Sequence, residues 1–176
     1  SITAESGIAN WLVNYLQIEH SFSPASSSFY LSLFFILFTL GRLFGGYLTE
    51  FLGYMKSIVY FSIMILVNFI LGILLKENGA IFFSITGLFI SIMFPTIIAI
   101  VIREFKKNTG TYMGFVITGA SATTMIINWI IGKTTEIFSV YIGFASIIIY
   151  IIALLFFLFF LNRTISSDNF STQNTY

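Results

Sequence analysis

The stretch FFSITGLFISIMF (residues 82–94) decides the fold class, because it is apolar almost throughout and carries no charge. A membrane-spanning β-strand would alternate between lipid-facing apolar and lumen-facing polar residues, and this stretch does not. The run IIIYIIALLFFLFFL (residues 147–161) is continuously apolar as well. Both stretches therefore predict membrane-spanning α-helices, which satisfy their backbone hydrogen bonds within one segment.

The composition of the whole chain agrees with a membrane protein. Of its 176 residues, 57% are hydrophobic and only 9% are charged, and the mean hydropathy is +0.97. Too few polar residues remain to cover a soluble domain of this size. A net charge of +1 argues against nucleic acid as a partner, because no basic stripe is present to contact phosphates. The absence of cysteine excludes disulfides and thiolate metal sites.

Six helices of membrane-spanning length are predicted, so the expected fold class is an all-α membrane protein, a six-transmembrane-helix bundle. A helix needs roughly 20 mostly apolar residues to cross about 30 Å of hydrocarbon. The stretches that meet or approach this length are residues 1–18, 26–47, 57–75, 80–102, 112–132 and 139–161. We expect a disordered tail over 162–176. The chain does not begin with methionine, and we expect it to be part of a longer protein.

The distribution of cationic residues predicts the orientation in the membrane. Short connections make neighbouring helices antiparallel, so alternate connections lie on the same side. One side carries most of the cations: Arg42, Lys56, Arg103, Lys106, Lys107 and Arg163. Lys76 and Lys133 lie on the other side. The positive-inside rule makes the first side, and the tail, cytoplasmic. We expect an integral, multi-pass protein of the plasma membrane.

The stretch GRLFGGYLTEFLGYMK (residues 41–56) concentrates glycine and charge in one connection. Its first and fifth residues form a small-xxx-small pattern, which lets a neighbouring helix approach closely. Two interpretations stay open: a packing seam followed by an ordinary positive loop, or a latch whose ion pairs form in only one conformation. The residues of this gate or loop motif are Gly41, Arg42, Gly45, Gly46, Glu50, Gly53 and Lys56.

The same stretch, read as G-R-x-x-G-G-x-x-x-E-x-x-G-x-x-K, resembles the loop motif between the eighth and ninth helices of the major facilitator superfamily. AESGIANWLVNYL (residues 4–16) resembles the seventh helix of its fucose/glucose/galactose–proton symporter and sodium-dependent glucose transporter-like branch. GLFISIMFPTIIAI (residues 87–100) resembles the tenth helix, with its break at Phe-Pro-Thr, and residues 119–144 resemble the eleventh helix and the turn after it. One departure is Glu50, where the superfamily usually has aspartate.

The resemblance implies the C-terminal half of a twelve-helix transporter, built as two inverted three-helix repeats (about 1–75 and 80–161) in one bundle over 1–161. This bundle would rock against a missing N-terminal six-helix half around a solute site near the middle of the bilayer. The implied function is secondary active transport of a small solute, a sugar, together with a proton or sodium ion. Besides that ion and the lipid bilayer, no cofactor is expected.

The first predicted helix carries a polar face that suits a sugar. Trp11, Asn14 and Gln17 share one side with Gly7 and Asn10. Amides can bind hydroxyl groups, and an indole offers an apolar plane to the C–H face of a sugar ring. The alternative is hydrogen bonding of amides between helices, which we favour for Asn10 and weigh equally for Asn14.

Two other helices carry polar residues at helical spacing. Thr118, Ser121, Thr124 and Asn128 form a stripe on the fifth predicted helix, and we expect Thr124 and Asn128 to contact the solute. On the fourth, Ser84, Gly87, Ser91 and Pro95 share a face. Pro95 is the predicted helix break, either beside a cavity or as a packing kink.

Glu5 is the candidate coupling residue, because an ionised carboxylate inside a membrane helix is costly and is a functional candidate by default. It lies about 180° around the helix from Asn14. Either the helix unwinds near Gly7, or Glu5 pairs with another helix and is structural.

An enzyme is not expected, because one histidine, no cysteine and no paired intramembrane aspartates leave no catalytic set. We also expect no metal site. The alternative function is a non-transporting, receptor-like or scaffold bundle of six helices, and the alternative solutes are other small polar metabolites or drugs.

Overall fold

The computed structural model describes residues 2–104 and 106–158, except for the side chain of Glu104, and this part of the chain is all-helical. Its elements are α1 (Ile2–His20), α2 (Pro24–Leu52), α3 (Tyr54–Leu74), the 3₁₀ helix η1 (Lys76–Gly79), α4 (Ala80–Glu104), α5 (Thr109–Ile137) and α6 (Val140–Ala145). After a turn at Ser146, residues 147–158 are helical again. The predicted tail and Arg163 lie outside the described residues.

Five helical segments are long and apolar enough to cross a membrane: Pro24–Leu52, Tyr54–Leu74, Lys76–Arg103, Thr109–Ile137 and Val140–Leu158. The all-α membrane prediction is therefore confirmed for these five. The sixth predicted span, α1, is a helix of 19 residues. It is not among the five because its amides and carboxylates lower its hydropathy.

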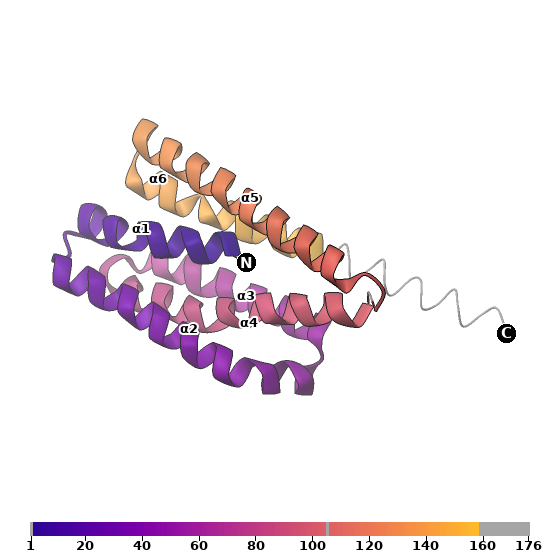
Figure 1. The fold of residues 1–176 in the computed structure, drawn as a ribbon. Coiled ribbons are helices and arrows are strands. Elements are labelled where there is room, and N and C mark those ends of the chain that lie inside the picture. The colour runs from indigo at the N-terminus through magenta and orange to yellow at the C-terminus, as the bar shows by residue number, and fades with distance from the viewer. Residues whose placement is uncertain (1, 105, 159–176) are drawn as a thin grey trace.

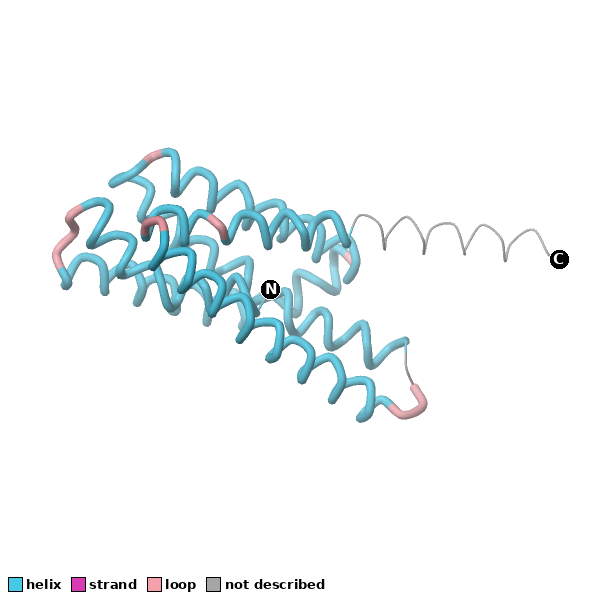
Figure 2. The backbone as a smooth tube through the Cα atoms, turned by 90° about the horizontal axis from the view of Figure 1, so that it is seen from above, coloured by secondary structure: helices cyan, strands magenta, loops and turns pink. Residues whose placement is uncertain are grey.

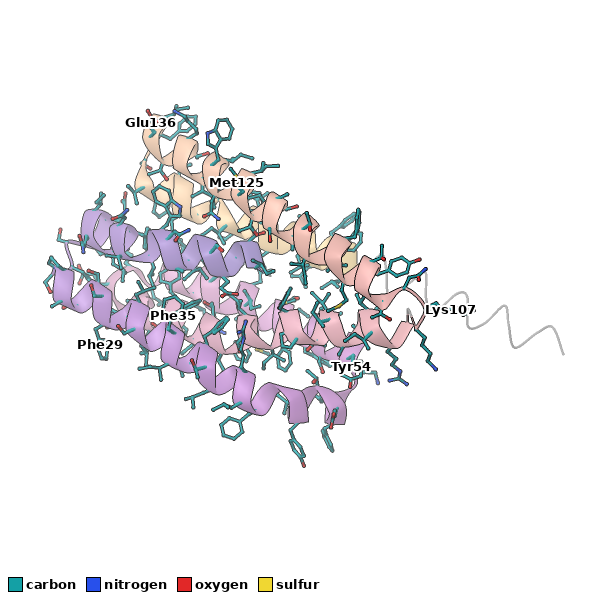
Figure 3. The ribbon with its side chains drawn as sticks, in the orientation of Figure 1. Phe29, Phe35, Tyr54, Lys107, Met125 and Glu136 are labelled. Carbon is teal, nitrogen blue, oxygen red and sulfur yellow. The ribbon has the colours of Figure 1, made fainter. Side chains whose placement is uncertain are left out.

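Neighbouring helices are antiparallel, as the short connections predict. The α1–α2 connection, η1 and the α5–α6 connection lie at one end of the bundle, and the other connections lie at the opposite end (Figure 1). Tyr54 and Lys107 mark that second end, and Glu136 marks the first (Figure 3). Seen from above, the α4–α5 connection lies well apart from the end of the 147–158 helix (Figure 2).

Helices extend further than their apolar stretches predict. Residues 49–56 were expected to form a loop, but α2 continues to Leu52 and α3 begins at Tyr54. Gly53 alone makes the reversal, with a positive φ of 84° that glycine adopts without strain. The Gly53 N–H donates to the Thr49 carbonyl at 2.9 Å, which caps α2. Hydropathy marks where hydrocarbon ends, whereas backbone hydrogen bonding continues a helix beyond that boundary.

A close helix contact joins α2 to α4 through small residues. A Cβ on Gly45 would lie 2.5 Å from the Ile92 side chain, and one on Gly87 would lie 2.5 Å from the Phe34 carbonyl oxygen. Ser84 donates from its hydroxyl to the Tyr30 carbonyl at 2.8 Å. The Gly41-xxx-Gly45 pattern is therefore part of a packing seam in this structure. On the fourth-helix face, Ser84, Gly87 and Ser91 pack against α2, whereas Pro95 is exposed and lines a cavity beside α2.

Pro95 does not break α4, which is helical from Ala80 to Glu104. An interruption of the helix at Pro95 is therefore not seen, and a kink there stays a prediction. Proline removes only one N–H from the helical ladder, the one that would bond the Ser91 carbonyl, and the helix continues through the remaining bonds. The next residue, Thr96, bonds within the same helix, from its hydroxyl to the Ile92 carbonyl at 2.6 Å.

Four aromatic rings fill the core where the helices of both halves of the chain meet. Tyr15 of α1 stacks on Phe144 of α6 with ring centroids 4.4 Å apart. Phe83 of α4 packs its ring edge-on against Tyr15, Phe144 and Phe69 of α3, at centroid distances of 5.6, 5.1 and 5.2 Å. All four side chains are fully buried. Edge-to-face pairs of this kind fix the relative positions of helices.

Candidate functional site

A polar contact joins α1 and α5, which run parallel to each other. The Asn10 amide donates to the Asn128 carbonyl oxygen at 3.3 Å, and Asn128 donates in turn to the Thr124 backbone carbonyl at 3.0 Å. Two turns before Asn10, the hydroxyl groups of Thr3 and Thr124 lie 3.3 Å apart. These bonds satisfy amides and hydroxyls that would be costly inside a bilayer.

Most of the predicted solute-binding residues already have partners in the bundle. Asn128 and Thr124 belong to the α1–α5 contact, so the preference for helix-to-helix bonding at Asn10 is confirmed. Gln17 donates to the Ser27 hydroxyl of α2 at 2.9 Å. The Trp11 ring lies against Gly132, where a Cβ would be 3.5 Å from it. The solute-binding roles of these residues stay predictions.

Asn14 differs from the other predicted residues. It is exposed on α1, and its amide makes no hydrogen bond with any described residue. Thr118 and Ser121 of α5 are exposed as well. A partner from outside the described bundle, whether water, solute or protein, is therefore needed to satisfy the Asn14 amide within a membrane.

Glu5 lies on the side of α1 that is buried further along the helix. Ile8, Leu12 and Leu16 follow Glu5 at +3, +7 and +11, and all three are fully buried. Glu5 itself is half-buried. α1 remains helical at Gly7, where a Cβ would lie 3.0 Å from Ile147. The unwinding expected as one alternative is therefore not seen, and Glu5 faces other helices.

A cavity of about 230 Å³ separates the end of α2 from α4. Arg42, Glu50 and Pro95 line it together with glycines of the loop motif. The Arg42 guanidinium lies over the Phe38 ring, 4.6 Å from the centroid, an interaction that the sequence reading missed although the i, i+4 spacing permits it.

The predicted latch is not closed in this structure. Among the described side chains the one ion pair joins Lys133 to Glu136 at 2.7 Å, at the opposite end of the bundle. Arg42, Glu50 and Lys56 are exposed and unpaired with one another. A latch that forms in only one conformation stays a prediction. No group of three or more acidic, histidine or cysteine side chains that could hold a metal ion occurs within the residues described.

The α1–α5 contact leads to a testable expectation. Asn128→Ala should lower the free energy of unfolding by about 0.6 kcal/mol and at most about 1.7 kcal/mol, the range for hydrogen bonds between membrane helices. Combining it with Asn10→Ala should cost less than the sum of the two single changes, because both remove one bond. Reversible unfolding in mixed micelles would measure this, and strictly additive losses would show that the bond does not form.

Comparison with known proteins complements this geometry. The family model described as Major Facilitator Superfamily matches residues 1–174 of the chain. No curated protein and no solved structure gave a significant match.

Proposed function

Because this chain belongs to the major facilitator superfamily, whose members carry small solutes by secondary transport, we propose that it acts in the symport of a sugar with a cation. The proposal places the bundle beside a second, N-terminal six-helix bundle, with the solute between them and access alternating between the two sides of the membrane. In the proposed orientation, the end that carries Lys56, Arg103, Lys106 and Lys107 is cytoplasmic.

The observation that carries this proposal is the unpartnered amide of Asn14 on the exposed side of α1. It lies one turn from Trp11, whose indole is half-buried against α5. An amide that faced lipid would be costly, whereas an amide beside a wet path can bind a hydroxyl group. Asn14 would thus contact the sugar, Trp11 would offer it an apolar surface, and Glu5 would be the coupling acid.

We expect Asn14→Ala to weaken the apparent affinity for the sugar roughly tenfold, the loss of about one hydrogen bond. Uptake of labelled hexoses by cells that express the full protein, compared with cells carrying the vector, would measure this. Asn68→Ala is a matched control, because the Asn68 amide bonds within its own helix to the Met64 carbonyl at 2.8 Å.

Three outcomes would contradict the proposal. Unchanged affinity in Asn14→Ala would remove this residue from the solute site. Failure of a cysteine at position 14 to react with water-soluble maleimides in any condition would show that no wet path reaches it; these 176 residues contain no other cysteine. Uptake no higher than in vector cells for every hexose would refute the proposed transport of a sugar.

A further inference from the structure

We propose that Arg42 is the counter-charge of Glu5, so that the two side chains form a charge pair linking α2 to α1. The inference rests on the coupling role proposed for Glu5 and assigns Arg42 as its positioning residue. In this proposal Arg42 is no longer one of the residues that latch the loop. Its partner is Glu5 of α1 instead.

The register of the two antiparallel helices brings the residues to one level. The bond between Gln17 and Ser27, 2.9 Å long, joins α1 to α2 near their connection. At 1.5 Å per residue, Glu5 lies about 18 Å from this bond along α1. On the same scale, Phe38 lies about 17 Å and the Arg42 backbone about 22 Å from it along α2. Glu5 is therefore level with Phe38.

The Arg42 side chain points back toward that level. Its guanidinium carbon lies 4.6 Å above the Phe38 ring, one helical turn nearer the α1–α2 connection than its own backbone. The ring face attracts the cation and holds the long side chain in this direction. The charged group of Arg42 consequently lies at the height of Glu5.

The direction of Glu5 fits as well. It continues the buried stripe of α1 toward the helices packed beneath it. The two helices diverge away from their connection (Figure 1), so a long side chain is needed to span the distance. Direct contact between Glu5 and Arg42, both within the described ranges, is not yet made. Formation of the pair therefore requires α1 and α2 to approach each other.

Glu50 is the competing carboxylate, and the geometry disfavours it. Glu50 lines the same cavity as Arg42. Glu50 lies eight residues further along α2, so its backbone is about 12 Å from that of Arg42, in the direction opposite to the one the guanidinium takes.

Arginine stays protonated, so Arg42 cannot carry a proton itself. Its role is to hold the Glu5 carboxylate charged and oriented until a cation replaces it.

A double-mutant cycle on the full chain tests the pair without relying on transport. Glu5→Gln and Arg42→Gln should each lower the midpoint of thermal unfolding by about 3 °C, because each leaves one charge without its partner. The double variant should lose clearly less than the sum of both. Arg103→Gln, which removes an exposed cation at the same end, is the matched control and should add to Glu5→Gln in full. Additive losses for Glu5 and Arg42 would overturn the proposal.

Transport gives a second, separate measurement. Arg42→Gln should lower the maximal uptake rate roughly tenfold, about 1.4 kcal/mol, with little change in the KM for the solute. Arg42→Lys should restore most of the rate, because it keeps the charge. Loss of the protein from the membrane in Arg42→Gln but not in Arg42→Lys would also support the pair, and loss in both would overturn it. The two measurements can also disagree. If the effects of the Glu5 and Arg42 variants on unfolding are non-additive but the protein takes up no hexose, the charge pair is supported and the proposed function is refuted.

Discussion

Replacing Gly41 with leucine should prevent the folded bundle from accumulating in the membrane. Gly41 is buried where α2 meets α4, and even a single Cβ there would overlap the Leu88 carbonyl oxygen and the Ser91 hydroxyl. The first of these belongs to the backbone and cannot rotate away. The two helices would have to separate, and the loss of stability should reach about 3 kcal/mol or more.

Separation of α2 from α4 is costly for a reason particular to membranes. Lipid tails are as apolar as leucine, so helices associate through close packing and hydrogen bonds rather than through removal of surface from water. Moving α2 outward would also lengthen the Ser84–Tyr30 hydrogen bond, which crosses the same seam. The change therefore removes both contributions at once.

Gly46→Leu is the matched control for this prediction. Gly46 lies on the same helix, and nothing in the described part of the chain lies within 4 Å of a Cβ built on it. The amount of each variant that is extracted as a monodisperse species, measured by gel filtration of a fluorescent fusion, should be near normal for Gly46→Leu and close to zero for Gly41→Leu. Equal yields from both would show that α2 and α4 do not meet through Gly41.

The sequence predicts the helices of this bundle well because each depends on local composition. Continuous apolar runs such as residues 82–94 require helices in a bilayer, and the Gly41-xxx-Gly45 spacing indicates close packing before any neighbour is known. What it could not identify was the neighbour, which proves to be α4, 47 residues further along at Leu88. Amphipathic helix ends such as 48–52 were also missed, because hydropathy falls before the backbone hydrogen bonds stop.

The candidate site was harder to predict, because its contacts depend on which helices are neighbours and the sequence does not identify them. Asn10 and Asn128 are 118 residues apart, and only the packing of α1 beside α5 turns two costly amides into partners. A polar stripe on one helix shows that partners are needed but does not show whether they are helices or solute. Asn14 remained without a described partner, whereas Gln17 found one in Ser27. Likewise, Arg42 could be assigned to a loop by its position but not to the ring of Phe38.

Replacing Phe83 with alanine should destabilise the bundle by about 3–5 kcal/mol, the usual range for removing a buried phenylalanine. The Phe83 side chain is completely buried inside the bundle, with an exposed fraction of 0%. It makes edge contacts with Tyr15, Phe69 and Phe144, which come from three different helices. Removing its ring leaves all three without a partner on one side, and Gly72 of α3, which faces the ring closely, has no side chain to fill the space.

Phe115→Ala provides the comparison, because the Phe115 side chain on α5 is 80% exposed. Thermal unfolding in detergent should shift little for Phe115→Ala and by roughly 10 °C for Phe83→Ala, taking about 3 °C per kcal/mol. Phe83→Leu should recover a good part of the loss, since it refills much of the volume without restoring the edge contacts. If the two alanine variants had the same midpoint of thermal unfolding, these rings would not be the packed centre of the bundle. The α1 and 147–158 helices would then have to be held to α3 and α4 by other contacts.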